Sequence, residues 1–130
     1  MARNHAEHAD VAIHVTRMRN KLSISSELLP GTLEMLILKT LSAGPAHGYG
    51  IARHLEQTSS DVLTIGESSL YPALQRLLVN GWVTANWGET DLNRRARFYR
   101  LTPAGRKRLA AETAAFSRMV GAINAIMQTG

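Results

Sequence analysis

The order of helical and strand patterns predicts a mainly α domain that carries a small β hairpin and ends in one long helix. Apolar residues recur at helical spacing in three short segments, and an alternating pattern typical of paired strands follows them. With 130 residues, of which 45% are hydrophobic, the chain is long enough for one small domain and an appendage. We therefore expect a flexible N-terminal arm at 1–27, the domain at 28–102 and a separate C-terminal helix at 103–130.

The first two helices of the domain have recognisable limits. Thr32 is a suitable N-cap for a helix over 33–41, and Gly44-Pro45 stops it. The second helix is expected over 47–57, with the side chain of His47 capping its start. Both segments place apolar residues on one face, so we expect them to pack against each other.

A third helix is expected from about 68 to 80, after a connection over 61–66 that ends in a very short strand. Pro72 is placed in its first turn, where a missing N–H costs little, and Gly81 supplies its C-terminal stop. The side chains predicted to lie wholly or partly outward on this helix are Ser68, Ser69, Tyr71, Gln75 and Arg76.

Two strands follow, at 82–87 and 97–101, and the polar segment 88–95 between them reads as a hairpin tip. Thr102-Pro103 then opens the last helix, with the proline at its first position. Helix, helix, short strand, helix, hairpin and helix is the order of a winged helix-turn-helix domain with one extra C-terminal helix. The hairpin tip would be the wing.

Basic residues are concentrated at the wing and at the start of the last helix. The chain holds 15 Lys and Arg against 10 Asp and Glu. Seven of the basic residues lie within fifteen positions that hold no acid: Arg94, Arg95, Arg97, Arg100, Arg106, Lys107 and Arg108. Guanidinium groups bind phosphate oxygens and release counterions from DNA, so we expect Arg94, Arg95 and Arg97 to contact the duplex. The alternative is a solvated charged face, and Arg100 and Arg106 fit a structural role best.

The outward side of the third helix has the chemistry of a DNA-reading surface. Ser68 and Ser69 allow close approach, while Gln suits adenine and Arg suits guanine, which makes Gln75 and Arg76 candidates for base contacts. Tyr71 either contacts DNA or is a half-buried packing residue.

The last helix carries an apolar seam at alternating spacings of four and three residues, made by Leu109, Thr113, Phe116, Val120, Ile123 and Met127. Such a heptad pattern favours helix pairing between two copies of the chain. The alternative is that the stripe packs onto the protomer's own first helix. We expect a homodimer, with Leu109, Phe116, Val120, Ile123 and Met127 as its contacts.

Four segments resemble the PadR family of transcriptional regulators: Leu33–Leu38, His47–Ile51, Leu70–Leu77 and Phe98–Gly105. The Leu-Tyr-Pro-Ala-Leu block and the Tyr-x-Leu-Thr-x-x-Gly block are specific when found in this order. The resemblance implies a winged-helix repressor of the short form, dimerised through its C-terminal helix, whose third helix enters the major groove. Some relatives bind flat aromatic drugs against a Trp of the last helix, and here that helix has none.

Several other functions find no support in the sequence. There is no Cys, and we see no catalytic triad, paired carboxylates, phosphate loop or metal-ligand spacing, so we expect no enzyme activity, no cofactor and no metal. His5 and His8 read as solvated. The apolar runs are too short for a membrane span or a signal-peptide core, which predicts a cytoplasmic protein with no membrane partner.

The sequence thus predicts a DNA-binding regulator, acting as a repressor and homodimer on a palindromic operator. Two alternatives stay open. One is a regulator of the same fold that senses an unidentified small molecule at the dimer interface. The other is a winged-helix protein-interaction module, which would bind DNA only weakly and without sequence preference.

Overall fold

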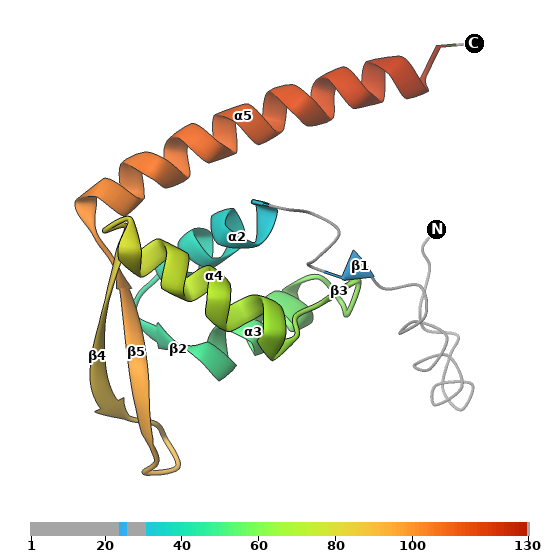
Figure 1. Ribbon diagram of the computed structural model, residues 1–130. Coiled ribbons are helices and arrows are strands. Elements are labelled where there is room, and N and C mark those ends of the chain that lie inside the picture. Colours follow the sequence, from blue (N-terminus) through green and yellow to red (C-terminus); the bar gives the residue numbers. More distant parts are fainter. Residues whose placement is uncertain (1–23, 26–30, 130) are drawn as a thin grey trace, which may run out of the picture.

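The computed structural model describes residues 24–25 and 31–129 (Figure 1). The elements are, in chain order, β1 (Ile24–Ser25), α2 (Thr32–Leu41), β2 (Ala46–His47), α3 (Gly48–Thr58), β3 (Leu63–Thr64), α4 (Glu67–Val79), β4 (Val83–Glu89), β5 (Arg95–Leu101) and α5 (Pro103–Met127). Three short helices, a hairpin and a long last helix make up the fold, so the predicted fold class is confirmed.

The hydrophobic core lies around α2, which contacts α3, α4, α5 and the sheet. Its apolar residues at helical spacing are buried, apart from the half-buried Leu36, because neighbouring elements cover the helix on several sides. The largest fully buried side chains are Ile37, Leu38, Leu41, Ile51, Leu74, Leu77 and Val83. Residues of α2, α3, α4 and the hairpin all contribute to this one cluster. Helix α4 and the hairpin therefore rest on the same closely packed core.

The structure confirms one predicted helix cap and corrects another. His47 is the N-cap of α3, and its Nδ1 accepts a hydrogen bond from the N–H of Gly50 at 3.1 Å. Thr32, in contrast, is the first residue of α2 and not its cap. Gly31 occupies the cap position with φ of 82°, a left-handed conformation that favours glycine, and no side chain caps this helix.

The predicted position of Pro72 was also wrong. Helix α4 begins at Glu67, so Pro72 is its sixth residue and lies beyond the first turn. A proline at this position removes one backbone donor from the helix interior. The residue is exposed, so the missing N–H falls on the solvent side of α4 and not on its buried side.

The hairpin strands reach further towards the tip than expected, and a third strand joins them. The order in the sheet is β2-β5-β4, with His47 opposite Phe98 and with Glu89 opposite Arg95 at the far end of the hairpin. A separate parallel pair joins β1 to β3, with Ile24 opposite Leu63. Two residues of the expected arm therefore form a strand, while the rest of 1–27 lies outside the described residues.

A network of short contacts fixes the direction in which α5 leaves the hairpin. Thr102 caps α5 by accepting from the N–H of Gly105 at 2.9 Å, and its hydroxyl donates to the carbonyl of Gly81 at 2.8 Å. A Cβ on Gly105 would lie 2.0 Å from the carbonyl oxygen of Trp82, so only glycine fits there. From this junction α5 passes over α2, and its C-terminal end projects beyond the domain (Figure 1). Within the described residues no helix is both long and apolar enough to cross a membrane.

Candidate nucleic-acid interface

Helices α3 and α4 and the turn between them form a helix-turn-helix unit. Ser60 and Asp61 have φ of 53° and 64°, which turns the chain sharply after α3. Glu56 of α3 accepts a hydrogen bond from the N–H of Ile65 at 3.0 Å, across the turn. This contact holds the start of α4 against α3. No sequence pattern singles out Glu56, because only the folded turn brings Ile65 to it.

The exposed ridge of α4 is made by residues three or four positions apart, Ser68, Tyr71, Gln75 and Val79. All four are exposed, while Ser69 is half-buried. The predicted DNA-facing residues Ser68, Tyr71 and Gln75 therefore share one face. Glu67, at the start of the helix, is also exposed, and its carboxylate lies at the helix N-terminus, where the helix dipole favours a negative charge.

Arg76 lies on a different side of α4. Its Nε donates to Oε2 of Glu34 on α2 at 2.6 Å, and the two side chains are 58% and 20% exposed. The ion pair directs the guanidinium towards α2. Its expected contact with a base edge stays a prediction, and this geometry disfavours it.

Tyr71 packs against α3 and is also partly exposed. Its ring lies against Gly48 of α3, where an added Cβ would come within 2.8 Å of the phenolic oxygen. The residue is nevertheless 46% exposed. Tyr71 thus packs on the start of α3 and still presents part of its side chain to a ligand.

The wing is a well-formed hairpin with its arginines exposed. At the tip, Thr90 donates its N–H to the carbonyl of Arg94 at 2.9 Å, and its hydroxyl oxygen accepts from the N–H of Leu92 and of Arg94. Arg95 and Arg97 follow on β5, two residues apart and therefore on the same face of the sheet. The three arginines predicted to contact DNA are all solvent-exposed.

A groove of about 390 Å³ lies between this face of the wing and the helix-turn-helix unit. Tyr71 of α4 and Tyr49 of α3 line one side, and Trp87, Arg95 and Arg97 line the other. Tyr49 is 68% exposed and was not among the predicted site residues. Its position at the start of α3 gave no signal, since only the packing of α3 beside the wing brings it to the groove.

Not all of the basic cluster faces this groove. Arg108 stacks over the indole of Trp82, with 4.5 Å from its guanidinium carbon to the ring centroid, and it forms an ion pair with Glu112. These contacts give Arg108 a structural role at the junction of β4 and α5. The sequence pattern favoured a structural role only for Arg100 and Arg106, because the contact of Arg108 with Trp82 forms only in the folded junction.

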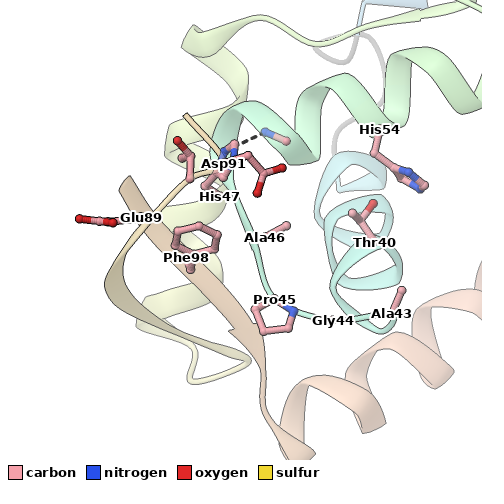
Figure 2. A pocket seen from close by; sticks show the side chains of 12 residues that line it. Thr40, Ala43, Gly44, Pro45, Ala46, His47, His54, Glu89, Asp91 and Phe98 are labelled. Carbon is pink, nitrogen blue, oxygen red and sulfur yellow. Dashed lines mark hydrogen bonds between the residues drawn. The ribbon is translucent and has the colours of Figure 1, made fainter. Parts of the chain in front are cut away.

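A second cavity, of about 420 Å³, lies between the end of α2, β2 and the wing tip (Figure 2). The rings of His47 and Phe98 meet edge to face, with centroids 5.2 Å apart, on one side of it, and Thr40 and His54 lie on the other. Within the part of the chain that the structure describes, no three His, Cys, Asp or Glu side chains are grouped so as to hold a metal ion.

The apolar face of α5 is largely uncovered in the protomer. Phe116 is 38% exposed, Ile123 49% and Met127 75%. Val120 is half-buried, and Leu109 packs against the protomer's own core. Leu109 therefore has a role within the protomer, and the open part of the seam begins at Thr113, which is exposed.

A helix-turn-helix unit flanked by an arginine-bearing hairpin defines a winged-helix DNA-binding regulator. The chain belongs to the PadR-like family of transcriptional regulators, whose family model matches residues 37–111. The match covers more than half of the chain and includes α3, α4 and the whole wing. It confirms the family that the sequence motifs suggested.

Solved structures agree with this assignment. A transcriptional regulator from Clostridium thermocellum is 28% identical, with a TM-score of 0.69 over 75% of this chain and 95% of that one. A PadR family regulator from Eggerthella lenta is 25% identical, with a TM-score of 0.66 over 92% of this chain and 94% of that one. A 37.1 kDa protein from a transposon of Streptomyces fradiae is 39% identical over 90 residues, which are 69% of this chain. The matched part spans about a quarter (24%) of that relative's length.

Proposed function

We propose that this regulator is a repressor that binds a palindromic operator as a homodimer. In this proposal the exposed ridge of α4 reads base edges in the major groove, with Gln75 at its centre. The wing holds the adjacent backbone through Arg94, Arg95 and Arg97. Base contacts then supply the sequence preference, and wing contacts supply affinity and register.

The observation that carries the proposal is the groove between α4 and the wing. Tyr71 on one wall and Arg95 and Arg97 on the other are separated by a space of about 390 Å³. Hydroxyl and guanidinium groups are the donors that proteins use most often on phosphate oxygens. The groove therefore has the chemistry to receive one sugar-phosphate strand while α4 lies in the major groove.

The homodimer is supported by the exposed apolar face of α5. One recognition helix reads too few base pairs for specific binding in a genome, whereas two helices related by a two-fold axis read two half-sites. Phe116, Ile123 and Met127 offer a self-complementary stripe on a helix that projects beyond the domain. A second copy of this helix is the partner that matches a heptad pattern best.

Repression requires only a DNA-reading domain and a means of dimerisation, and residues 31–129 form such a domain together with α5. A dimer on an operator that overlaps a promoter blocks transcription by occupying the site.

Selection of binding sites from a random duplex library tests the proposal. We expect an enriched palindrome whose half-site centres lie about one duplex turn apart, roughly 34–36 Å. In vitro transcription from a promoter carrying that palindrome should fall as protein is added. Enrichment of no sequence, with binding lost at physiological salt, would instead support a protein-interaction module.

A further inference from the structure

We propose that aromatic rings on the wing hold its DNA-contacting arginines in place, and that Trp87 is the positioning residue for Arg95. The inference rests on the proposed function, since it concerns the phosphate contacts of the wing. It assigns a role to Trp87, an exposed aromatic residue that neither the fold nor the base-reading surface requires.

The first observation is the stacking of Arg95 on Trp87. The guanidinium carbon lies 4.8 Å from the centroid of the indole ring, a cation–π distance. The two residues belong to different strands, because Trp87 on β4 is directly opposite Arg97 on β5. Arg95 is thus the diagonal neighbour of Trp87 on the same face of the hairpin.

The second observation is that Arg97 has a similar support. Its guanidinium carbon lies 5.8 Å from the ring of Tyr99, two residues along β5 and buried at the base of the hairpin. Two arginines and two aromatic rings therefore lie together on the face that lines the groove opposite Tyr71. We call these four residues, Trp87, Arg95, Arg97 and Tyr99, the wing ladder.

The third observation is that Trp87 is 60% exposed. Leaving a large indole in water has a free-energy cost, and its contact with the Arg95 guanidinium recovers only a part of it. Burial in the core therefore does not account for this side chain. The other tryptophan, Trp82, is half-buried and packs against the core.

Stacking favours phosphate binding by arginine in two ways. The flat face of the guanidinium rests on the ring, which leaves the N–H groups at its edge pointing outward for bidentate contact with phosphate oxygens. Stacking also restricts the side-chain rotamers before DNA arrives, so less conformational entropy is lost on binding. Trp87 then raises affinity without itself adding a charge.

The test compares Trp87→Leu, Trp87→Phe and Arg95→Ala by fluorescence anisotropy with labelled duplexes over a range of salt. Arg95→Ala should lower affinity for every sequence. It should also make the slope of log K against log salt less negative by about 1 per protomer. Trp87→Leu should weaken binding about two- to fivefold per protomer and leave that slope unchanged, because the charge of Arg95 remains. Trp87→Phe, which keeps a ring under the guanidinium, should recover most of the affinity.

A double-mutant cycle separates positioning from direct contact. If Trp87 acts through Arg95, the variant with both Trp87→Leu and Arg95→Ala should bind as Arg95→Ala alone does. Thermal unfolding of each variant verifies that the hairpin remains folded. Additive losses, or wild-type affinity in Trp87→Leu, would overturn the role of Trp87. No effect of Arg95→Ala on affinity or slope would instead refute the proposed wing contact with DNA.

Discussion

The guanidinium of Arg76 on α4 forms an ion pair with the carboxylate of Glu34 on α2, with 2.6 Å between Nε and Oε2. The pair joins two helices through residues that are 42 positions apart in the chain. Gln75, its neighbour in sequence, lies on the exposed ridge of α4. Adjacent residues of one helix point about 100° apart, so the two side chains of this predicted base-reading pair occupy different surroundings.

The different surroundings of these two residues predict different mutant behaviour. Gln75→Ala should relax discrimination between the operator and a mutated site by about 1–3 kcal/mol per lost base contact. Arg76→Ala should leave discrimination unchanged and lower the free energy of unfolding by about 0.2–1 kcal/mol, because the lost ion pair is largely exposed. Anisotropy with both duplexes measures the first effect, and urea unfolding measures the second. Equal loss of discrimination in the two variants would show that Arg76 leaves Glu34 to contact DNA.

The wing arginines predict a steep salt dependence of DNA binding. With three to five phosphate contacts per protomer of a dimer, the slope of log K against log salt should be about −5 to −9. Arg94→Ala combined with Arg95→Ala should make this slope less negative by about 3–4, since four phosphate contacts are lost per dimer. It should weaken binding to all sequences about equally. Lys39→Ala is the matched control, because this basic residue is exposed on α2, outside the groove residues. A slope near zero for the wild-type protein would refute the phosphate contacts.

Local patterns predicted the helices and the hairpin, and longer-range pairing explains what they missed. The start of α5 was predictable because Thr102 and Pro103 carry the whole capping signal within two residues. Strand β2 was not, because its two residues become a strand only by pairing with β5, where His47 meets Phe98. The same holds for β1, where Ile24 pairs with Leu63.

In the candidate site, too, local patterns predicted exposure, and contacts between distant elements could not be predicted. Exposure of Gln75 and Tyr71 followed from the helical period of the leucines on the buried side of α4. The ion pair of Arg76 did not, because Glu34 reaches it from another helix. Nor could sequence alone place Tyr49 across the groove from Trp87, since α3 and the wing are brought together by the core beneath them.

The close packing around Gly105 predicts that adding a single methyl group there lowers the stability of the protein strongly. In Gly105→Ala the Cβ would lie 2.0 Å from the backbone carbonyl oxygen of Trp82, which cannot move without shifting β4. Overpacking of this kind should lower the free energy of unfolding by about 1–3 kcal/mol. Urea unfolding at a fixed protein concentration measures it.

Gly121→Ala is the matched control on the same helix. Nothing lies within 4 Å of the Cβ it would add, so this change should instead stabilise the protein by about 0.5–1 kcal/mol through the higher helix propensity of alanine. Equal stability changes in the two variants would contradict the tight junction between the hairpin and α5.

The open face of α5 predicts a dimer that two charges can break. Phe116→Asp combined with Val120→Asp places carboxylates in the centre of the apolar seam, where pairing of two helices would bury them. Burial of unpaired carboxylates should cost several kcal/mol, more than a short helical interface can lose. We therefore expect the wild-type chain to sediment as a homodimer and the variant as a monomer or as insoluble chain.

Ala114→Asp combined with Ala125→Asp provides the control for this experiment. Both alanines are exposed, and helical spacing puts them on the side of α5 opposite Phe116. This variant carries the same added charge and should remain dimeric in sedimentation equilibrium. It should also protect a full palindrome from nuclease, whereas the Phe116 and Val120 variant should protect at most a half-site. A seam variant that stays dimeric and protects the whole palindrome would show that the two reading helices are joined elsewhere, and that the spacing of the half-sites is not set by α5.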